Sequence, residues 1–236
     1  MGNQTQMPRQ RDLNRTRERI MAAAQKEFAA HGFAGARTDA IARRAHVNER
    51  MIFYCFESKE GLYRALLAHK LSAKTAMIES TPDEDYTSSL VRGFATCCDD
   101  IDVLLMWQWE ALDRSDRKLV AEGERRAHFQ AEVARYRRAK ASGALPPDVD
   151  EQMLLLVGAA LRTFPLTFPQ ITSLVTGMDP LDPEFRRKWS TWLEWVGRRL
   201  LAPPGKSGDK IDGKAGRVRK RSPSRKAAGS SRHQGS

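Results

Sequence analysis

The sequence lacks the residue patterns that most enzyme active sites and metal sites require. It contains no glycine-rich phosphate loop, no HExxH pair and no nucleophile elbow. Its five histidines are scattered along the chain, at positions 31, 46, 69, 128 and 233. We therefore predict that the protein is not an enzyme and that it holds neither a metal nor a cofactor.

Cysteine is equally scarce, with three residues in a chain of 236: Cys55, Cys97 and Cys98. Three cysteines cannot form a disulfide framework, and so low a count fits a reducing compartment. No second cysteine pair lies at metal-ligand spacing from Cys97 and Cys98. We interpret this pair as buried or half-buried thiols. The alternative is a redox switch.

Long uncharged apolar segments are missing as well. No run of about 18 such residues occurs, so we expect no membrane span. The opening segment, MGNQTQMPRQRDLNRTRER, lacks the apolar stretch that a secretory signal needs. We therefore expect a cytoplasmic protein with no membrane partner.

Excess positive charge is absent from the middle of the chain and concentrated at its ends. The net charge is +11, of which residues 1–60 carry +4, residues 61–202 carry −1 and residues 203–236 carry +8. Basic segments of this kind indicate a polyanionic partner, and nucleic acid is the first candidate.

Strand-like alternation of useful length is also lacking, and helical periodicity recurs instead, as in Ile20, Ala24 and Phe28. We therefore predict an all-α protein of about nine helices. Gly32 is expected to end the first helix in a left-handed conformation, and Thr38, Asn48 and Ser58 to cap the next three. The expected spans are 15–31, 38–45, a short helix after Asn48, 59–80, 84–101, 102–114, 116–141, 153–175 with a kink or division at Pro165 and Pro169, and 184–201.

Residues 45–63, AHVNERMIFYCFESKEGLY, resemble the signature of TetR-family transcriptional regulators, a helix-turn-helix family. The matching positions are Ala45, Val47, Phe56, Ser58, Lys59, Glu60 and Leu62. The resemblance is close over residues 15–65, whereas the later helices resemble the family only in number, length and order. It departs from the family pattern at the turn glycine, which is His46, and at two phosphate-contacting positions, Phe53 and Cys55.

The resemblance implies an N-terminal three-helix head that binds DNA, followed by a C-terminal helical domain for ligand binding and dimerisation. We therefore expect a flexible basic arm at 1–14, the helix-turn-helix domain at 15–58 and the ligand-binding and dimerisation domain at 59–202. Residues 203–236 contain no aromatic and few branched apolar residues, so we expect a disordered basic tail there.

The third expected helix has one face for the head and another for DNA. Ile52 and Phe56 are four residues apart and should pack inward. Arg50 is the best base reader on the other face, because its guanidinium can pair with guanine. The predicted DNA-contacting residues are this face with nearby helix starts and basic positions: Thr38, Arg43, Arg44, Asn48, Glu49, Arg50, Met51, Phe53, Tyr54 and Lys59.

Other arginines are weaker candidates for DNA contact. Arg9, Arg11, Arg15 and Arg17 of the arm could add phosphate contacts, and the alternative for each is an ordinary solvated side chain. We interpret a later arginine run as a solvated helix face. It comprises Arg125, Arg126, Arg135, Arg137 and Arg138.

The resemblance places an effector in the neutral block 84–175. Ligand pockets are mostly apolar with a few polar anchors, and the candidate lining has that character, although each member could equally be ordinary core. Arg162 lies in the apolar run GAALRTF, where it would bind an acidic ligand, pair with an acid such as Glu110 or Asp113, or reach solvent. The candidates are Phe94, Cys98, Met106, Trp107, Trp109, Phe129, Arg162, Phe164 and Phe168.

Together these features predict a sequence-specific DNA-binding transcription regulator. As the resemblance implies, we expect a repressor that a small, largely apolar effector releases from a palindromic double-stranded DNA operator. We expect a homodimer through residues 153–175 and 184–201, where Trp189, Trp192 and Trp195 lie on one stripe. The alternative is a nucleic-acid binder dominated by the basic tail, with little sequence specificity.

Overall fold

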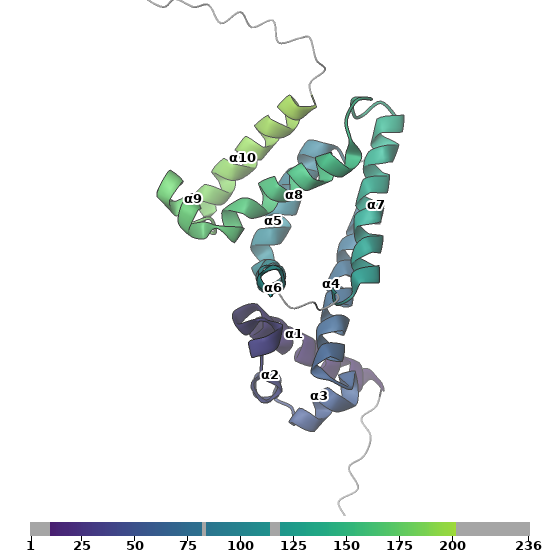
Figure 1. Ribbon diagram of the computed structural model, residues 1–236, viewed down its shortest axis with the longest axis vertical. Coiled ribbons are helices and arrows are strands. Elements are labelled where there is room, and N and C mark those ends of the chain that lie inside the picture. Colours follow the sequence, from purple (N-terminus) through teal and green to yellow (C-terminus); the bar gives the residue numbers. More distant parts are fainter. Residues whose placement is uncertain (1–9, 82–83, 114–118, 202–236) are drawn as a thin grey trace, which may run out of the picture. The chain divides into compact units, whose positions relative to one another are not determined.

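The computed structural model describes residues 10–81, 84–113 and 119–201, and every regular element within these ranges is a helix. The all-α prediction is confirmed. There are ten described helices rather than about nine, because the apolar segment predicted at 153–175 divides at Phe168. Their order along the chain is α1 (Gln10–Gly35), α2 (Thr38–Ala45), α3 (Glu49–Phe56), α4 (Lys59–Ser80), α5 (Tyr86–Asp99), α6 (Ile101–Leu112), α7 (Glu122–Ala141), α8 (Glu151–Thr167), α9 (Pro169–Thr176) and α10 (Pro183–Leu200) (Figure 1).

The first helix, α1, is the longest element and supplies the centre of the head. Ile20, Ala24 and Phe28 are fully buried, as their four-residue spacing predicts. Gly32 has a positive φ of 66°, but its ψ of 176° is not helical, so α1 breaks there and adds one more turn. Phe33 then folds back and stacks on Phe28 with ring centroids 6.1 Å apart.

The helix-turn-helix follows directly. His46 ends α2 in the left-handed conformation (φ 53°, ψ 48°), which histidine tolerates better than a branched residue. Asn48 begins α3, and its side chain accepts a hydrogen bond from the Arg50 N–H. The predicted cap at Thr38 is wrong by one residue: Arg37 occupies the cap position without a side-chain hydrogen bond that caps the helix, and Thr38 is the first helical residue.

The fourth helix, α4, belongs to both halves of the fold. It spans Lys59–Ser80, as predicted, and the Ser58 hydroxyl accepts the Gly61 N–H at 2.9 Å. Its first turns bury Leu62 and Leu66 in the head core, and Ile78 is buried further along. In Figure 1, α1 and α3 lie beside the first half of α4, while α7 lies beside its second half.

The remaining helices enclose two further apolar cores. One lies among α5, α7 and α8 around Tyr86, Tyr136 and Leu154. The other lies among α5, α8 and α10 around Phe94 and Leu193. Within the described ranges no single helix has the length and apolar composition of a membrane span, and α8 and α9 reach that composition only as a pair bent by 83°.

Two predicted boundaries need correction. Residues 10–14 are the first turn of α1, although we expected a loose arm there, and residues 1–9 lie outside the described ranges. The helix expected to start at residue 116 begins at Glu122, after Ala121 in a left-handed conformation. The tail expected at 203–236 also lies outside the described ranges.

Candidate DNA interface and effector cavity

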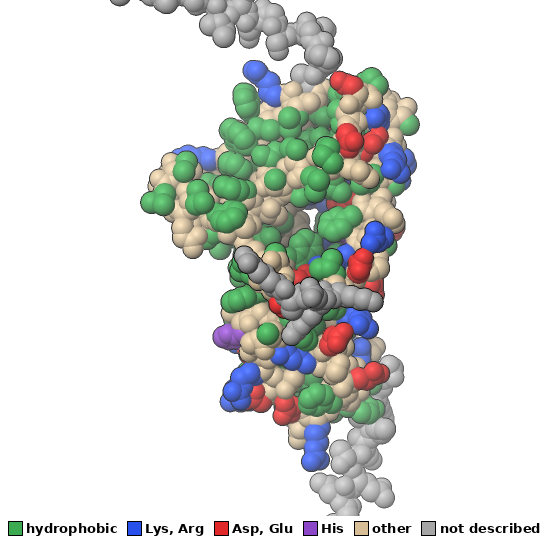
Figure 2. All heavy atoms as spheres, viewed as in Figure 1, with side chains coloured by type: hydrophobic (Ala, Val, Ile, Leu, Met, Phe, Trp, Pro, Cys, Tyr) green, Lys and Arg blue, Asp and Glu red, His purple; other side chains and the backbone are tan. Residues whose placement is uncertain are grey.

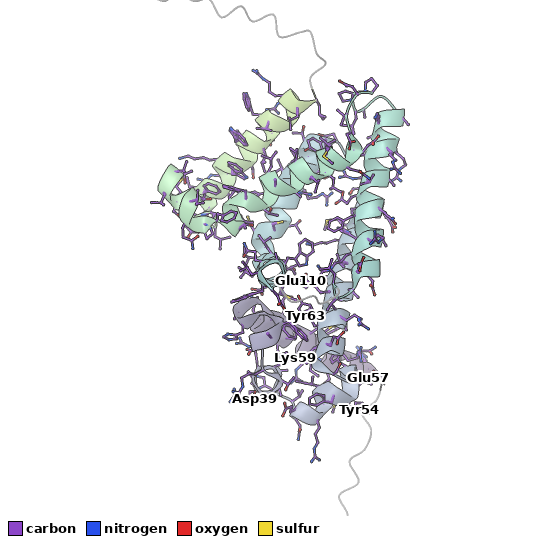
Figure 3. The ribbon with its side chains drawn as sticks, in the orientation of Figure 1. Asp39, Tyr54, Glu57, Lys59, Tyr63 and Glu110 are labelled. Carbon is purple, nitrogen blue, oxygen red and sulfur yellow. The ribbon has the colours of Figure 1, made fainter. Side chains whose placement is uncertain are left out.

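The third helix, α3, separates its residues by face as a groove-reading helix must. Its eight residues make a rod of about 12 Å, which suits a major groove of about 12 Å width. Ile52 and Phe56 are buried in the head core. Phe53 and Tyr54 are 44% and 53% exposed, so two aromatic rings stand on the open side. Figure 3 shows Tyr54 on α3 at the end of the head that is remote from Glu110 on α6.

The residues predicted to contact DNA bases come just before Phe53 and Tyr54 in the sequence. Glu49 and Arg50 are exposed in the first turn of α3, and Asn48 directly before them uses its amide oxygen to cap the helix. Met51 is less open than predicted, since it is half-buried and packs against the head core. The Thr38 hydroxyl donates to the Glu49 carboxylate, which ties the start of α2 to the start of α3.

Basic residues surround this face, and several already have acidic neighbours. Arg43 and Arg44 are exposed on α2. Arg43 lies 3.7 Å from the Asp39 carboxylate, and Arg37 donates to the same group at 3.0 Å. The hydrogen bond from Arg37 lowers the pKa of Asp39. Lys59 at the start of α4 is half-buried, with its ammonium 3.3 Å from the Ala34 carbonyl and 5.0 Å from the Phe33 ring centroid.

Two arginines of α1 hold the helix-turn-helix together. Arg17 donates to the Cys55 carbonyl and lies 4.4 Å from the centroid of the Phe56 ring. Arg19 donates to the Ala45 carbonyl at the end of α2. Both satisfy carbonyls that a helix end leaves without partners. Arg17 was considered for phosphate contact, and Arg19 was missed because no local pattern reveals which helix end it will reach.

Cys55 is also placed differently from the family expectation. Its side chain is only 8% exposed and belongs to the head core, so it does not face a phosphate. Burial raises the pKa of its thiol. Burial likewise raises the pKa of Cys97, and that of Cys98 to about 11. All three therefore remain protonated thiols near neutral pH, which disfavours a redox switch.

The predicted effector residues separate into four groups. Trp107, Phe129 and Arg162 line one cavity of about 130 Å³ among α4, α5, α6, α7 and α8. Phe94 and Cys98 are buried in the core between α5, α8 and α10. Met106 and Trp109 face a different hollow, at the end of α1. Phe164 and Phe168 are 48% and 45% exposed on the outer side of α8 and α9.

The cavity contains charged residues that the sequence did not single out. Arg135 is 3% exposed and lies 3.2 Å from Glu132 and 3.6 Å from Glu84. Arg92 donates to Glu84 at 2.6 Å, and this bond raises the pKa of Arg92. His128 is also buried, with its Nδ1 3.0 Å from the Thr75 hydroxyl.

The arginine run of α7 is therefore not one solvated face, as predicted. Arg126, Arg137 and Arg138 are exposed, but Arg135 is buried. Arg125 is half-buried and donates to Glu110 at 2.6 and 3.1 Å through its two terminal nitrogens. The pattern failed here because α7 packs against α4 and α8 along a face that contains charged residues.

Comparison with known proteins identifies relatives for the head and for most of the chain. A family model described as "Bacterial regulatory proteins, tetR family" matches residues 20–66. The HTH-type transcriptional repressor SCO4008 of Streptomyces coelicolor is 29% identical over 169 residues, which cover 71% of this chain and 86% of that protein. The HTH-type transcriptional repressor NicS of Pseudomonas putida is 44% identical over 61 residues, which cover 26% of this chain and 29% of NicS.

Solved structures extend the likeness to the whole described fold. A transcriptional regulator of Streptomyces coelicolor, SCO4942, has a TM-score of 0.65 at 25% identity and covers 80% of this chain and 99% of its own. FadR of Bacillus subtilis, solved in complex with stearoyl-CoA, has a TM-score of 0.56 at 15% identity and covers 75% and 96%. The relatives regulate transcription and are not enzymes, in agreement with the missing catalytic motifs.

Proposed function

We propose that this chain, a DNA-binding transcription regulator whose residues 20–66 match the TetR family model, is a homodimeric repressor. It binds a two-fold, near-palindromic operator and leaves it when a small molecule enters the cavity among α4–α8. Two relatives bear the name of transcriptional repressor. A regulator of this kind works in the bacterial cytoplasm, where its operator is.

The observation that carries the DNA-binding half of this proposal is the exposed face of α3. Glu49, Arg50, Phe53 and Tyr54 stand on one side of a helix whose other side is locked into the head by Ile52. A rigid helix of this kind places few side chains at base edges with little loss of conformational freedom. The Arg50 guanidinium can donate two hydrogen bonds to a guanine edge, and the Tyr54 hydroxyl can donate one to a phosphate.

Selection of bound sequences from a random duplex pool tests this directly. The expected product is a site with two inverted half-sites, since a two-fold dimer presents two α3 helices about one DNA turn, roughly 34–36 Å, apart. A pool that yields no preferred sequence would instead favour the alternative, a binder dominated by residues 203–236. Deleting residues 203–236 distinguishes the two hypotheses. The proposal requires that the shortened protein still gives a sequence-specific gel shift.

The dimer surface is the apolar outer side of α8, α9 and α10. Figure 2 shows hydrophobic side chains gathered over these helices. Leu174 and Val175 are 86% and 79% exposed on α9, and Trp192 and Trp195 are 42% and 48% exposed on α10. An apolar surface of this extent marks an interaction site. Its further members are Met153, Leu156, Val157, Phe164, Phe168 and Ile171.

A second copy is the occupant we propose for this surface, because a two-fold operator requires two heads. Sedimentation at micromolar concentration should show a dimer. Leu156→Glu on α8 places a charge in this interface and should give monomers with far weaker operator binding. Arg138→Glu, at an exposed position on α7, is the matched control. A wild-type monomer under these conditions would contradict the dimer.

The sixth helix, α6, provides a mechanical route from the cavity to the head. Trp107 lines the cavity, whereas Trp109 donates its indole N–H to the Ala29 carbonyl of α1 at 3.0 Å. A Cβ added at Gly32 would come within 3.1 Å of the Trp109 ring, so α6 and α1 are in close contact. An effector that displaces Trp107 would therefore also move α1. The other possible route is α4, which lines the cavity with Lys74 and Ile78 and packs into the head core with Leu62.

Trp109→Phe tests this route. Phenylalanine keeps much of the ring but cannot make the hydrogen bond to Ala29. The variant should bind an effector as the wild type does, yet need more of it to leave the operator, because less of the binding energy reaches the head. If the same effector concentration releases the operator from Trp109→Phe and from the wild type in a gel-shift titration, the movement is transmitted through α4 instead.

The domain boundaries are part of the same proposal. The head comprises α1–α3, and the effector and dimer domain comprises residues 59–201, with α4 shared between them. The basic arm and tail at the two ends would add salt-dependent, sequence-independent affinity for DNA.

A further inference from the structure

The cavity among α4–α8 has unsatisfied hydrogen-bond donors in its wall. The indole N–H of Trp107 and the Nε–H of Arg135 are buried and have no hydrogen-bond partner among the described residues. A buried polar group without a partner destabilises the protein, so such groups are rare in native structures. Both can only donate, and they would be satisfied by an acceptor inside the cavity.

Arg162 adds a charge that no carboxylate neutralises. Its Nε donates to the Gly158 carbonyl at 3.1 Å, and no ion pair among the described residues includes it. Its side chain lies against Gly93, where an added Cβ would come within 2.3 Å of the Arg162 Cδ. Glu110, one of the partners considered from the sequence, is already bound to Arg125.

The surrounding charges do not balance. Lys74, Arg92, Arg135 and Arg162 line the cavity, whereas Glu132 is the one acid in its lining. Glu84 lies behind the wall and pairs with Arg92 and Arg135. Two carboxylates thus face four cations. His128 adds no charge near neutral pH, because burial lowers its pKa.

The volume of the cavity limits the size of its occupant. At about 130 Å³ it is close to the volume of about 150 Å³ that holds a benzene molecule in an engineered protein. The wall also contains apolar and aromatic side chains, among them Ile78, Phe129 and Leu155. An occupant therefore needs an apolar body of about one ring and an anionic group beside it.

We infer that the effector is a small organic carboxylate, of about the size of one aromatic ring, whose carboxylate meets Arg162, Arg135 and the Trp107 indole. This inference rests on the proposed function and sharpens it. The sequence alone predicted a largely apolar ligand, and the excess of cations and of unsatisfied donors changes the expected ligand to an acid.

A charge series at constant shape tests the inference. The full-length protein is mixed with benzoate, its neutral analogue benzamide or its cationic analogue benzylamine, at one ionic strength set with sodium chloride. The same series is run for short branched acids such as isovalerate with their amides. The melting temperature and the heat of binding are measured. The acids should bind roughly tenfold to hundredfold more tightly than the amides, as expected for charge-assisted hydrogen bonds.

Arg162→Met provides the matched variant, because it keeps an unbranched, flexible apolar stem and removes the guanidinium charge. It should lose at least tenfold in benzoate affinity. Arg138→Met, on the exposed side of α7, should leave both the benzoate affinity and the operator shift unchanged. Equal binding of acid and amide, tighter binding of the amine, or full benzoate affinity in Arg162→Met would each overturn the inference.

The two proposals fail in different ways. If an acid binds through Arg162 and the operator complex stays intact at saturation, the inference about the ligand stands and the release mechanism is wrong. If only neutral or cationic compounds release the operator, the release mechanism stands and the inference about the ligand is wrong.

Discussion

The head and the proposed effector domain of this regulator are both helical, but their buried side chains differ in polarity. The head core is almost wholly apolar, and Glu27 is its one strongly buried acid among the described residues. The effector domain buries Glu132, Arg135 and His128 around a cavity. An apolar, close-packed core holds one conformation, whereas a partly satisfied polar cavity changes its energy when a ligand enters. The contrast fits a rigid reader joined to a responsive sensor.

The largest expected effect is on the head core. Phe28→Ala removes a fully buried ring that contacts Phe33 and Tyr63. It should lower the free energy of unfolding by about 3–5 kcal/mol, because a cavity remains where the ring was. Urea unfolding followed by circular dichroism measures the change. A loss below about 1 kcal/mol would mean that the head core is not the rigid unit described above.

Arg50→Ala should act on DNA binding without acting on the fold. Arg50 is exposed, so its removal leaves no cavity, but the loss of a guanine contact should weaken specific binding by about 1–3 kcal/mol, or roughly tenfold to hundredfold. A gel shift on the selected operator measures it, with Arg126→Ala on the exposed side of α7 as control. Equal losses in both variants would indicate a general charge effect.

The stabilisation contributed by helix caps provides a finer comparison of the two regions. Asp150 accepts the N–H groups of Gln152 and Met153 at 2.9 Å each, whereas Ser58 accepts that of Gly61 alone. Asp150→Ala should cost up to about 2 kcal/mol and Ser58→Ala about 1 kcal/mol, because the aspartate also meets the positive helix end. The reverse order in urea unfolding would contradict this account of the caps.

The smallest effect is a pH dependence confined to the effector domain. The His128 ring faces Thr75 and Glu132, and Lys74 and Arg162 lie on the same cavity wall. Burial holds its pKa below the ordinary 6.5, so below pH 6.5 the unfolded chain takes up a proton that the folded protein does not. The stabilisation is thus complete above pH 6.5 and is lost as the pH falls toward the folded pKa, by at most about 1.4 kcal/mol per pH unit.

His128→Asn should remove this slope. Urea unfolding between pH 5 and 7.5 measures it, with the exposed His69→Asn on α4 as the matched control. A wild-type slope that persists unchanged in His128→Asn would assign the pH dependence to other groups.

Local chemistry made much of the head predictable. Asn48 and Ser58 cap their helices as the sequence indicates, and Ile52 and Phe56 are buried as their spacing requires. Each of these outcomes depends on residues within about one helical turn of one another, so a single stretch of sequence contains the information. Thr38 was misplaced by one residue, which is the usual uncertainty of a helix end.

The effector domain was less predictable, because its site is assembled from five helices. Phe94, Trp107 and Phe164 are indistinguishable as aromatic residues in helical patterns, yet one is core, one lines the cavity and one is exposed. Arg135 was assigned to the solvated face of α7 with its neighbours, although it is among the most buried charges described.

The sequence by itself determined the helical class, the helix-turn-helix, the resemblance to the TetR family and the caps at Asn48 and Ser58, because periodicity, capping and the signature are all local. Only the tertiary structure decided that Arg135 and Arg162 meet Trp107 in one cavity and that Arg17 and Arg19 close the ends of α3 and α2. Helical periodicity defines the faces of each helix, but which faces meet depends on the packing of segments that lie 26 to 80 residues apart. That packing turned an arginine from an apparent surface charge into a buried part of the candidate effector site.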